Sequence, residues 1–152
     1  MINLISLRRH VIRPLLMSCN LWSHAAENLI IGTGLIESEF SFIKQFKGPA
    51  LGFWQIEPNT YHFMVGCIKR KKEREELILE ALEYNRFPKV ERLLSDMSLS
   101  IIMARYRYLI NLEPLPKASD IEGLARYWAK IYNTKNDEDQ IGRFVYLYNR
   151  HA

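Results

Sequence analysis

The sequence predicts one compact all-α domain that covers residues 1–152. Residues that favour strands or interrupt helices are scarce. Valine occurs only four times, and glycine and proline together make up 13 of the 152 residues, below their usual share of roughly 12%. Apolar residues instead recur with the spacing of an amphipathic helix, as in Leu93, Met97, Ile101 and Tyr108. A chain of this length buries roughly 70% of the surface that its unfolded form exposes, so it requires neither disulfides nor a structural metal.

Two helices are expected in the first quarter of the chain. The first covers residues 4–19, and Pro14 either kinks it or starts a second piece, because proline lacks the N–H that bonds to the preceding turn. Ser23 is a typical N-cap residue, since its hydroxyl can accept a hydrogen bond from a free backbone N–H. It predicts a second helix over residues 24–37.

A connector that carries Gly48 and Gly52 follows, and the next two helices are shorter. Pro58 suits the first position of a helix, where its missing N–H is tolerated, and this helix is expected to end near Cys67. Residues 69–83 are rich in charge and predict a helix with a solvated face.

The last part of the chain predicts three more helices. One runs over residues 89–112 and is stopped by the two prolines of residues 113–116. Residues 119–122, Ser-Asp-Ile-Glu, are typical of a capping box, in which the Ser and Glu side chains satisfy free N–H groups at a helix start. The helix that begins there is expected to end near Asn133. A polar turn then leads to a final helix over residues 138–150.

The chain is moderately basic. Its 21 Lys and Arg against 17 Asp and Glu give a formal net charge of +4, which favours an anionic partner such as nucleic acid, an acidic lipid surface or a cell-wall polymer. The longest apolar stretch, residues 28–36, is too short to cross a bilayer, so we expect no stable membrane insertion. Residues 1–16 do not follow the pattern of a signal peptide, because basic residues interrupt their apolar run.

The most informative segment is residues 29–40, in which a carboxylate ends an almost uncharged helix. When Glu37 is partly buried among apolar neighbours, its charged form is disfavoured and its pKa rises, which is what a general acid near neutral pH needs. Gly32 and Gly34 each weaken a helix interior by roughly 1 kcal/mol relative to Ala, so we expect another backbone or a ligand to approach them closely. The alternative is that Glu37 only marks the point where the helix leaves the core.

A second informative segment, residues 49–60, has the composition of a sugar-binding loop. Gly52 permits a tight approach, and the aromatic pair Phe53 and Trp54 can stack on the face of a sugar. The amide of Gln55 can both donate to and accept from hydroxyl or N-acetyl groups.

Together the two segments resemble the lytic transglycosylase branch of the lysozyme superfamily. That family has a catalytic Glu followed by Ser at a helix end, matched here by Glu37 and Ser38, and then a Gly-Leu-Met-Gln-like block, matched here by the residues that end at Gln55. Gln55 follows Glu37 by 18 residues, a spacing similar to that of the family. The resemblance implies that Glu37 is the catalytic acid and base, and that Ser38, Trp54 and Gln55 bind or position the glycan.

Two further blocks extend the resemblance to about residue 133. Tyr108 resembles the tyrosine of the family's Tyr-Leu block, which binds substrate. Residues 124–128, Leu-Ala-Arg-Tyr-Trp, resemble a Leu-Ala-Ala-Tyr-Asn stretch whose tyrosine lines the saccharide cleft, although Trp128 replaces the Asn. A second Tyr-Asn pair begins one turn later at Tyr132, so the tyrosine of the cleft is either Tyr127 or Tyr132.

The resemblance implies a lysozyme-like helical fold and cleavage of the β-1,4 bond between N-acetylmuramic acid and N-acetylglucosamine in peptidoglycan. In the family, one Glu protonates the glycosidic oxygen and then acts as a base while the C6 hydroxyl of the muramoyl residue closes a 1,6-anhydro ring. No metal, organic cofactor or second carboxylate is required for this reaction.

A hydrolytic muramidase is the alternative enzyme, and it usually requires a second carboxylate. Glu39 and Glu57 are the only acidic residues near the proposed site in sequence. Glu39 is two positions from Glu37 and faces another side of the helix, so we expect it to be exposed or ion-paired. Glu57 precedes Pro58 at a helix start, where capping is its expected role.

Two functions without catalysis stay open: a structural or wall-binding phage protein that keeps the fold, and a basic nucleic-acid-binding domain. The run at residues 69–76 holds five basic residues, but its three acidic ones weaken it as a nucleic-acid footprint. We therefore expect no nucleic-acid partner. Without a signal peptide, the protein is expected to be made in the cytoplasm and to reach the cell wall as part of a phage particle or on release at lysis.

Overall fold

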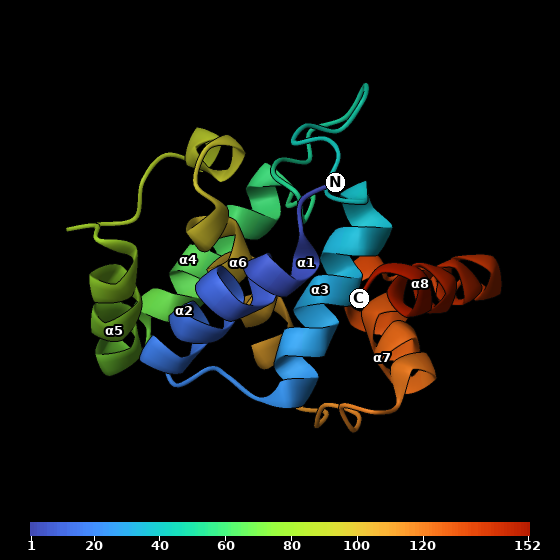
Figure 1. Cartoon of the computed structure of the whole chain (residues 1–152). Coiled ribbons are helices and arrows are strands. Elements are labelled where there is room, and N and C mark those ends of the chain that lie inside the picture. Colours follow the sequence, from blue (N-terminus) through green and yellow to red (C-terminus); the bar gives the residue numbers. More distant parts are fainter.

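Helix α3, His24–Ser38, is the central element of the structure (Figure 1). It begins as predicted at Ser23, whose hydroxyl accepts a hydrogen bond from the N–H of Ala26 at 3.0 Å. Most of its side chains are buried, because helices α6, α7 and α8 all pack against it. The computed structural model describes residues 1–152, and it is compact and all-α, without a strand.

The predicted first helix is present, with an irregular turn in its middle. It consists of α1 (Leu4–Leu7), a π-helical turn (Arg8–Ile12) and α2 (Arg13–Ser18). Pro14 lies in the first turn of α2, where a missing N–H is tolerated, so it starts a second piece. No helix of the chain is both long enough and apolar enough to span a membrane.

The two short helices in the middle of the chain are confirmed. Helix α4 (Pro58–Lys69) begins at the predicted proline, and helix α5 (Lys72–Leu82) follows directly. In α5 only Ile78 and Leu82 are buried, and most of its charged side chains are exposed, as expected for a helix with a solvated face.

The prediction of one continuous helix over residues 89–112 is wrong. The segment forms a 3-10 turn (Val90–Leu94) and a separate helix α6 (Met97–Leu109). The break is at Asp96, whose carboxylate accepts a hydrogen bond from the N–H of Leu99 at 3.1 Å and so caps the start of a new helix.

The C-terminal helices lie where they were predicted, with one correction at a cap. Helix α7 (Ile121–Trp128) continues through a π-helical turn (Ala129–Asn133), and the last helix is α8 (Glu138–His151). The capping box is not formed as predicted, because Asp120 and not Ser119 is the N-cap residue. The Asp120 carboxylate accepts a hydrogen bond from the N–H three residues later at 2.9 Å.

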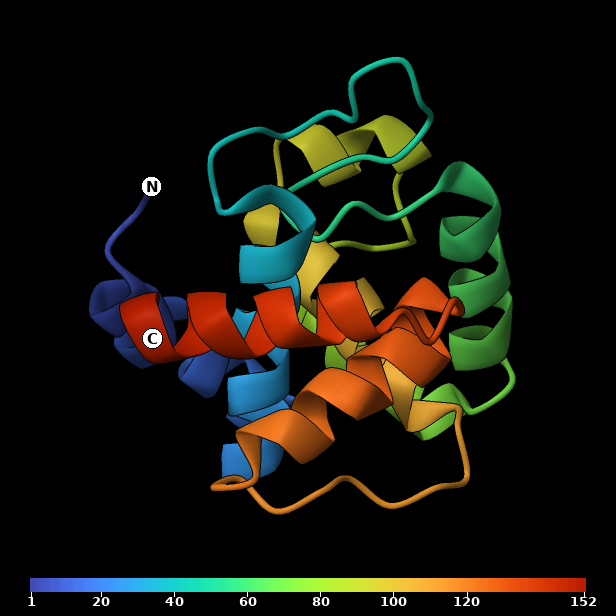
Figure 2. The ribbon, with the colours of Figure 1, turned by 90° about the vertical axis from the view of Figure 1, so that its right-hand side faces the viewer.

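Helix α8 crosses α3 where α3 has no side chain (Figure 2). A Cβ atom on Gly32 would lie 2.1 Å from the ring of Phe144, and one on Gly34 would lie 2.1 Å from the ring of Phe40. The close approach predicted from the two glycines is therefore made by aromatic rings, and not by a backbone or a ligand. The packing belongs to one core cluster of 39 buried residues, from Leu4 in α1 to Tyr148 in α8.

A buried ion cluster joins the two ends of the chain to α3. Glu27 is only 1% exposed and accepts hydrogen bonds from Arg8, Arg13 and Trp22 at 2.7 to 3.0 Å. Arg8 also donates to the hydroxyl of Tyr148 in α8 at 3.1 Å. Burial by itself raises the pKa of Glu27, but the three donors outweigh it and bring this pKa down to about 2.

Replacing Glu27 with Gln is expected to lower the free energy of unfolding by about 3 kcal/mol at neutral pH, because two guanidinium groups lose their counter-charge. The folded pKa of about 2 lies below the ordinary value of 4.5. The stabilisation by the Glu27 carboxylate is therefore complete at pH values above 4.5 and is lost as the pH falls through about 2. Urea unfolding of both proteins at neutral pH and near the folded pKa measures this loss.

The matched control is Glu138→Gln, which breaks the exposed ion pair between Glu138 and Arg126 at 2.8 Å. Exposed pairs contribute little to stability, so this variant is expected to unfold almost like the parent protein. An equal loss of stability in the two variants contradicts the role given to the buried cluster.

Candidate active site

A cleft of about 1170 Å³ opens at the C-terminal end of α3. One wall is the loop between α3 and α4, which projects from the body of the molecule (Figure 1). The rest of the lining comes from four helical elements and the residues that follow the last of them. Glu37 lies in α3, Thr60 in α4, Arg107 in α6 and Tyr132 in the π-helical turn after α7, while Gln55 belongs to the loop.

Glu37 is the titratable group with the chemistry of a general acid. Its Oε1 accepts a hydrogen bond from the indole N–H of Trp128 at 3.0 Å. Burial raises the pKa of Glu37 to about 7, while the Trp128 hydrogen bond and the positive charge of Arg107 oppose this rise. Neither protonation state of the carboxyl is strongly disfavoured near neutral pH, so it can both give and take a proton.

The turn that follows Glu37 ends helix α3 and joins it to the loop. Helix α3 ends because Glu39 and Phe40 both adopt left-handed backbone angles, with φ of 51° and 50°. The hydroxyl of Ser38 accepts the N–H of Phe40 at 3.1 Å and donates to the carbonyl of Phe53 at 2.7 Å. Ser38 is buried and does not line the cleft, so its predicted contact with the glycan is corrected: it fastens the helix end to the loop.

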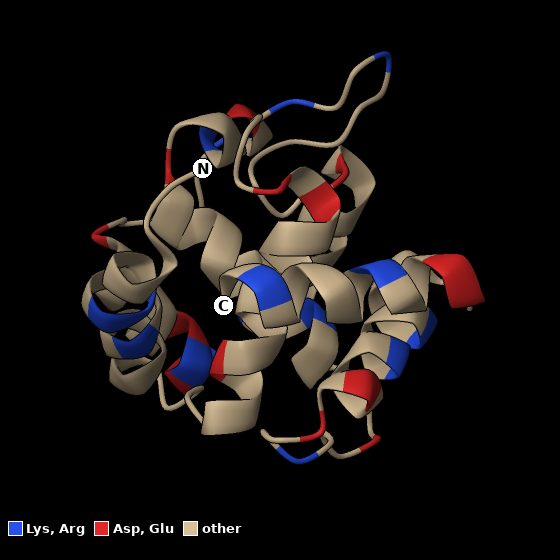
Figure 3. Ribbon diagram, turned by 45° about the vertical axis from the view of Figure 1, so that its right-hand side comes forward, with Lys and Arg blue, Asp and Glu red and all other residues tan.

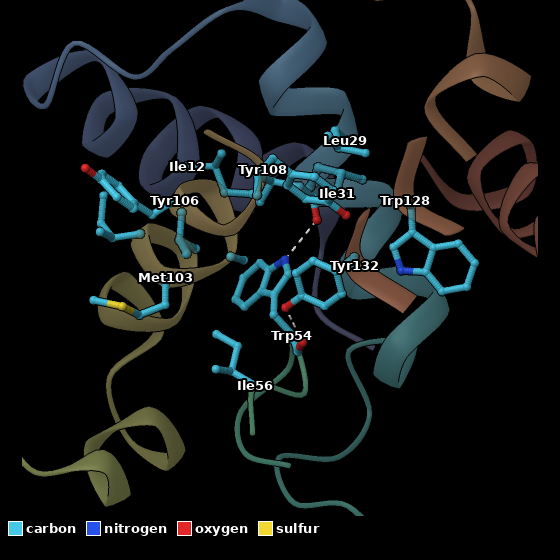
Figure 4. Packing of buried hydrophobic residues seen from close by; sticks show 14 of the residues in the cluster. Ile12, Leu29, Ile31, Trp54, Ile56, Met103, Tyr106, Tyr108, Trp128 and Tyr132 are labelled. Carbon is cyan, nitrogen blue, oxygen red and sulfur yellow. Dashed lines mark hydrogen bonds between the residues drawn. The ribbon is translucent and has the colours of Figure 1, made fainter. Parts of the chain in front are cut away.

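Trp54 lies in the hydrophobic core (Figure 4). Its side chain is 0% exposed, and its indole N–H donates to the carbonyl of Ile30 in α3 at 2.8 Å. Its own carbonyl accepts a hydrogen bond from the hydroxyl of Tyr132 at 2.6 Å. The predicted stacking of Trp54 on a sugar is therefore wrong, because the ring anchors the loop to α3 and has no free face.

Gln55 lines the cleft, as expected from its motif. Its φ of 49° lies in the left-handed region, which is uncommon for a residue other than glycine and costs about 1 kcal/mol or more. The side-chain amide donates to the carbonyl of Gly52 at 2.8 Å and so stabilises this turn. Gln55 thus lines the same cleft as Glu37, with its amide nitrogen bonded to the loop.

Of the three candidate tyrosines, only Tyr132 lines the cleft. Tyr127 is buried and donates its hydroxyl to the carbonyl of Glu113 at 2.9 Å. Tyr108 is buried as well, and its hydroxyl lies 2.7 Å from that of Thr33. Of the two alternatives, Tyr132 is the one that lines this cleft, while Tyr108 and Tyr127 contribute to the core.

The two candidate second carboxylates differ in their surroundings. Glu39 forms an ion pair with Arg143 at 2.5 Å, as expected, and does not line the cleft. Glu57 does line the cleft. It occupies the N-cap position of α4 as predicted, but its side chain makes no capping hydrogen bond.

Two residues that act on the Glu37 carboxyl, Trp128 and Arg107, were not predicted from the sequence. The sequence analysis noted Trp128 only because it replaces the Asn of the family's motif. An indole N–H can nevertheless donate a hydrogen bond, as an amide N–H does. Arg107 donates to the hydroxyl of Thr60 at 3.2 Å and to the carbonyl of Tyr132 at 3.0 Å. Its guanidinium carbon lies 5.1 Å from the centroid of the Tyr132 ring. No local pattern in the sequence indicates this position.

No family model, curated protein or solved structure matches this chain. Its function has to be inferred from the chemistry of the cleft. The feature that calls for an explanation is a carboxyl with a raised pKa at a helix end, which lines a large cleft together with an amide and a tyrosine.

Replacing Trp128 with Phe is expected to raise the pKa of Glu37 by about one unit, because Phe removes the N–H that stabilises the carboxylate and keeps much of the ring. An NMR titration of the glutamate carboxyl groups measures the change. Tyr127→Phe is the matched control, since it removes a buried hydroxyl from the same helix without touching Glu37. An unchanged or lower pKa in the Trp128 variant contradicts the assignment.

Proposed function

We propose that this protein is a peptidoglycan lytic transglycosylase, with Glu37 as its single acid and base. The observation that carries the proposal is that Glu37, with a pKa of about 7, shares one cleft with Gln55 and Tyr132. Gln55 follows Glu37 by 18 positions in the sequence, and Tyr132 follows it by 95. The family resemblance assigns catalysis to Glu37, positioning of the glycan to Gln55 and the tyrosine of the cleft to Tyr132.

In the first step, protonated Glu37 gives its proton to the glycosidic oxygen as the bond between that oxygen and C1 of the muramoyl residue breaks. The Trp128 N–H bonds to Oε1, which leaves Oε2 as the oxygen that carries the proton. The same N–H and the positive charge of Arg107 stabilise the carboxylate that remains after the transfer.

In the second step, the Glu37 carboxylate takes the proton of the muramoyl C6 hydroxyl while that oxygen bonds to C1. A 1,6-anhydro ring closes, no water is consumed, and Glu37 returns to its protonated form. A carboxyl with a pKa near the working pH serves both steps, because neither protonation state is strongly disfavoured.

The mass of the products tests this proposal. Purified peptidoglycan incubated with the protein is expected to yield anhydro-muropeptides, which are one water lighter than the products of hydrolysis. Glu37→Gln is expected to lower the rate by about 100- to 10,000-fold, the usual contribution of a general acid and base. Unchanged lysis by this variant contradicts the catalytic assignment. Protein bound to a glycan whose mass does not change indicates a wall-binding role instead.

Loss of activity in Glu37→Gln must be separated from loss of folding. The folded pKa of about 7 lies above the ordinary value of 4.5, so stability falls as the pH rises between these two values. Gln carries no charge to desolvate. At mildly alkaline pH the variant is therefore expected to be more stable than the parent protein, by up to about 3 kcal/mol in urea unfolding. This difference in stability is expected to disappear below pH 4.5, the ordinary pKa of the carboxyl.

A hydrolytic muramidase is the second candidate, and one observation favours it. Glu57 lines the same cleft as Glu37, and its side chain makes no capping hydrogen bond. It is therefore available as the second carboxylate that hydrolysis requires.

Replacing Glu57 with Gln separates the two mechanisms. Under the proposed transglycosylase mechanism the variant keeps most of its turnover and still forms anhydro products, because no step uses Glu57. Under hydrolysis it loses turnover. Glu39→Gln is the matched control, since it removes a carboxylate that is paired with Arg143 outside the cleft. Both rates are measured on the same peptidoglycan as before.

A further inference from the structure

Positive charges predominate in the lining of the cleft. Four basic side chains line it: Lys44, Lys47, Arg107 and Lys135. The only carboxyls in the lining are those of Glu37 and Glu57, and burial raises the pKa of the first. The cleft therefore attracts an anionic ligand.

The three lysines are not neutralised by the protein. None of them forms an ion pair, although the chain has six such pairs elsewhere. Lys44 donates to the carbonyl of Gly48 at 3.1 Å, and the ammonium group of Lys47 lies 5.4 Å from the centroid of the Phe46 ring. These contacts leave the charges of both lysines without a carboxylate partner.

The lysines stand on two different elements around Glu37. Lys44 and Lys47 belong to the projecting loop, whose basic segments are visible in Figure 3, and Lys135 follows the turn that carries Tyr132. The loop also presents Phe46, which is 86% exposed and lines the cleft. An exposed aromatic ring can pack against the apolar face of a sugar. The lining thus suits a polymer that offers sugar faces to the loop and negative charges to the lysines.

We propose that the cleft selects glycan strands that still carry their peptide side chains, with the peptide carboxylates next to Lys44, Lys47 and Lys135. This inference rests on the proposed function and adds the chemical form of the substrate. Strands stripped of peptide keep only the lactyl carboxylate close to each muramoyl ring, and chitin oligosaccharides have no carboxylate at all. Both leave ammonium groups of the cleft without a counter-charge.

Binding to three soluble probes tests the proposal: peptide-bearing glycan strands, the same strands after amidase treatment, and chitohexaose. Glu37→Gln protein is used so that the probes are not cleaved. Affinity is expected to fall in that order, and the preference for peptide is expected to weaken with added salt, because salt screens exposed charges. Equal affinity for peptide-bearing and stripped strands overturns the proposal, as does a preference that salt does not change.

The lysines themselves are tested by the double substitution Lys47→Gln and Lys135→Gln in the same protein. An exposed ion pair changes an equilibrium constant by about two- to fivefold, so losing two is expected to lower the affinity for peptide-bearing strands about tenfold. Lys72→Gln with Lys117→Gln is the matched control, because it removes the same charge from exposed positions outside the cleft. An equal loss in the control overturns the proposal.

Cleavage assays on the same strands with unmutated protein separate this inference from the proposed function. Anhydro products formed at equal rates from peptide-bearing and stripped strands support the proposed function and overturn the inference. Selective binding of peptide-bearing strands without cleavage of either probe supports the inference and overturns the proposed function.

Discussion

The burial of α3 is the constraint on which the rest of the structure depends. Helix α3 can be covered on many sides because its side chains between Glu27 and Glu37 carry no charge. Its two glycines let the rings of Phe144 and Phe40 lie against its backbone, which brings α8 and the projecting loop close to it. The C-terminal end of this helix carries Glu37, and the cleft forms there.

A layer of buried aromatic side chains connects α3 to the walls of the cleft. Trp54 bonds through its indole to α3 and through its carbonyl to Tyr132, so the loop and the π-helical turn are held by the same residue. Tyr132 in turn stacks on Tyr108 with ring centroids 5.3 Å apart and lies beneath the guanidinium of Arg107. The positions of the cleft residues therefore follow from hydrophobic packing underneath them, and substitutions in this layer are expected to move the cleft.

The sequence predicts most of the helices because their signals are local. Ser23 and Pro58 start helices α3 and α4 by interactions within a few residues. The break before α6 was missed because apolar spacing continues across it, while Asp96 alone decides the cap. In the site, motif spacing identified Glu37 and Gln55 as cleft residues. It could not show that Trp54 is covered, since the burial of an aromatic ring depends on segments far away in sequence.

Glu27 and Glu37 show how one helix gives the same residue type two opposite protonation states. Both carboxyls are removed from water, which alone raises the pKa of each. Glu27 receives bonds from two guanidinium groups and an indole, and its pKa falls to about 2, so it stays charged at any pH where the protein is expected to work. Glu37 receives one indole N–H, and its pKa is about 7. A mechanism with a single carboxyl needs a group that loses and regains a proton within one turnover. Of the two carboxyls, only Glu37 has a pKa that allows this near neutral pH.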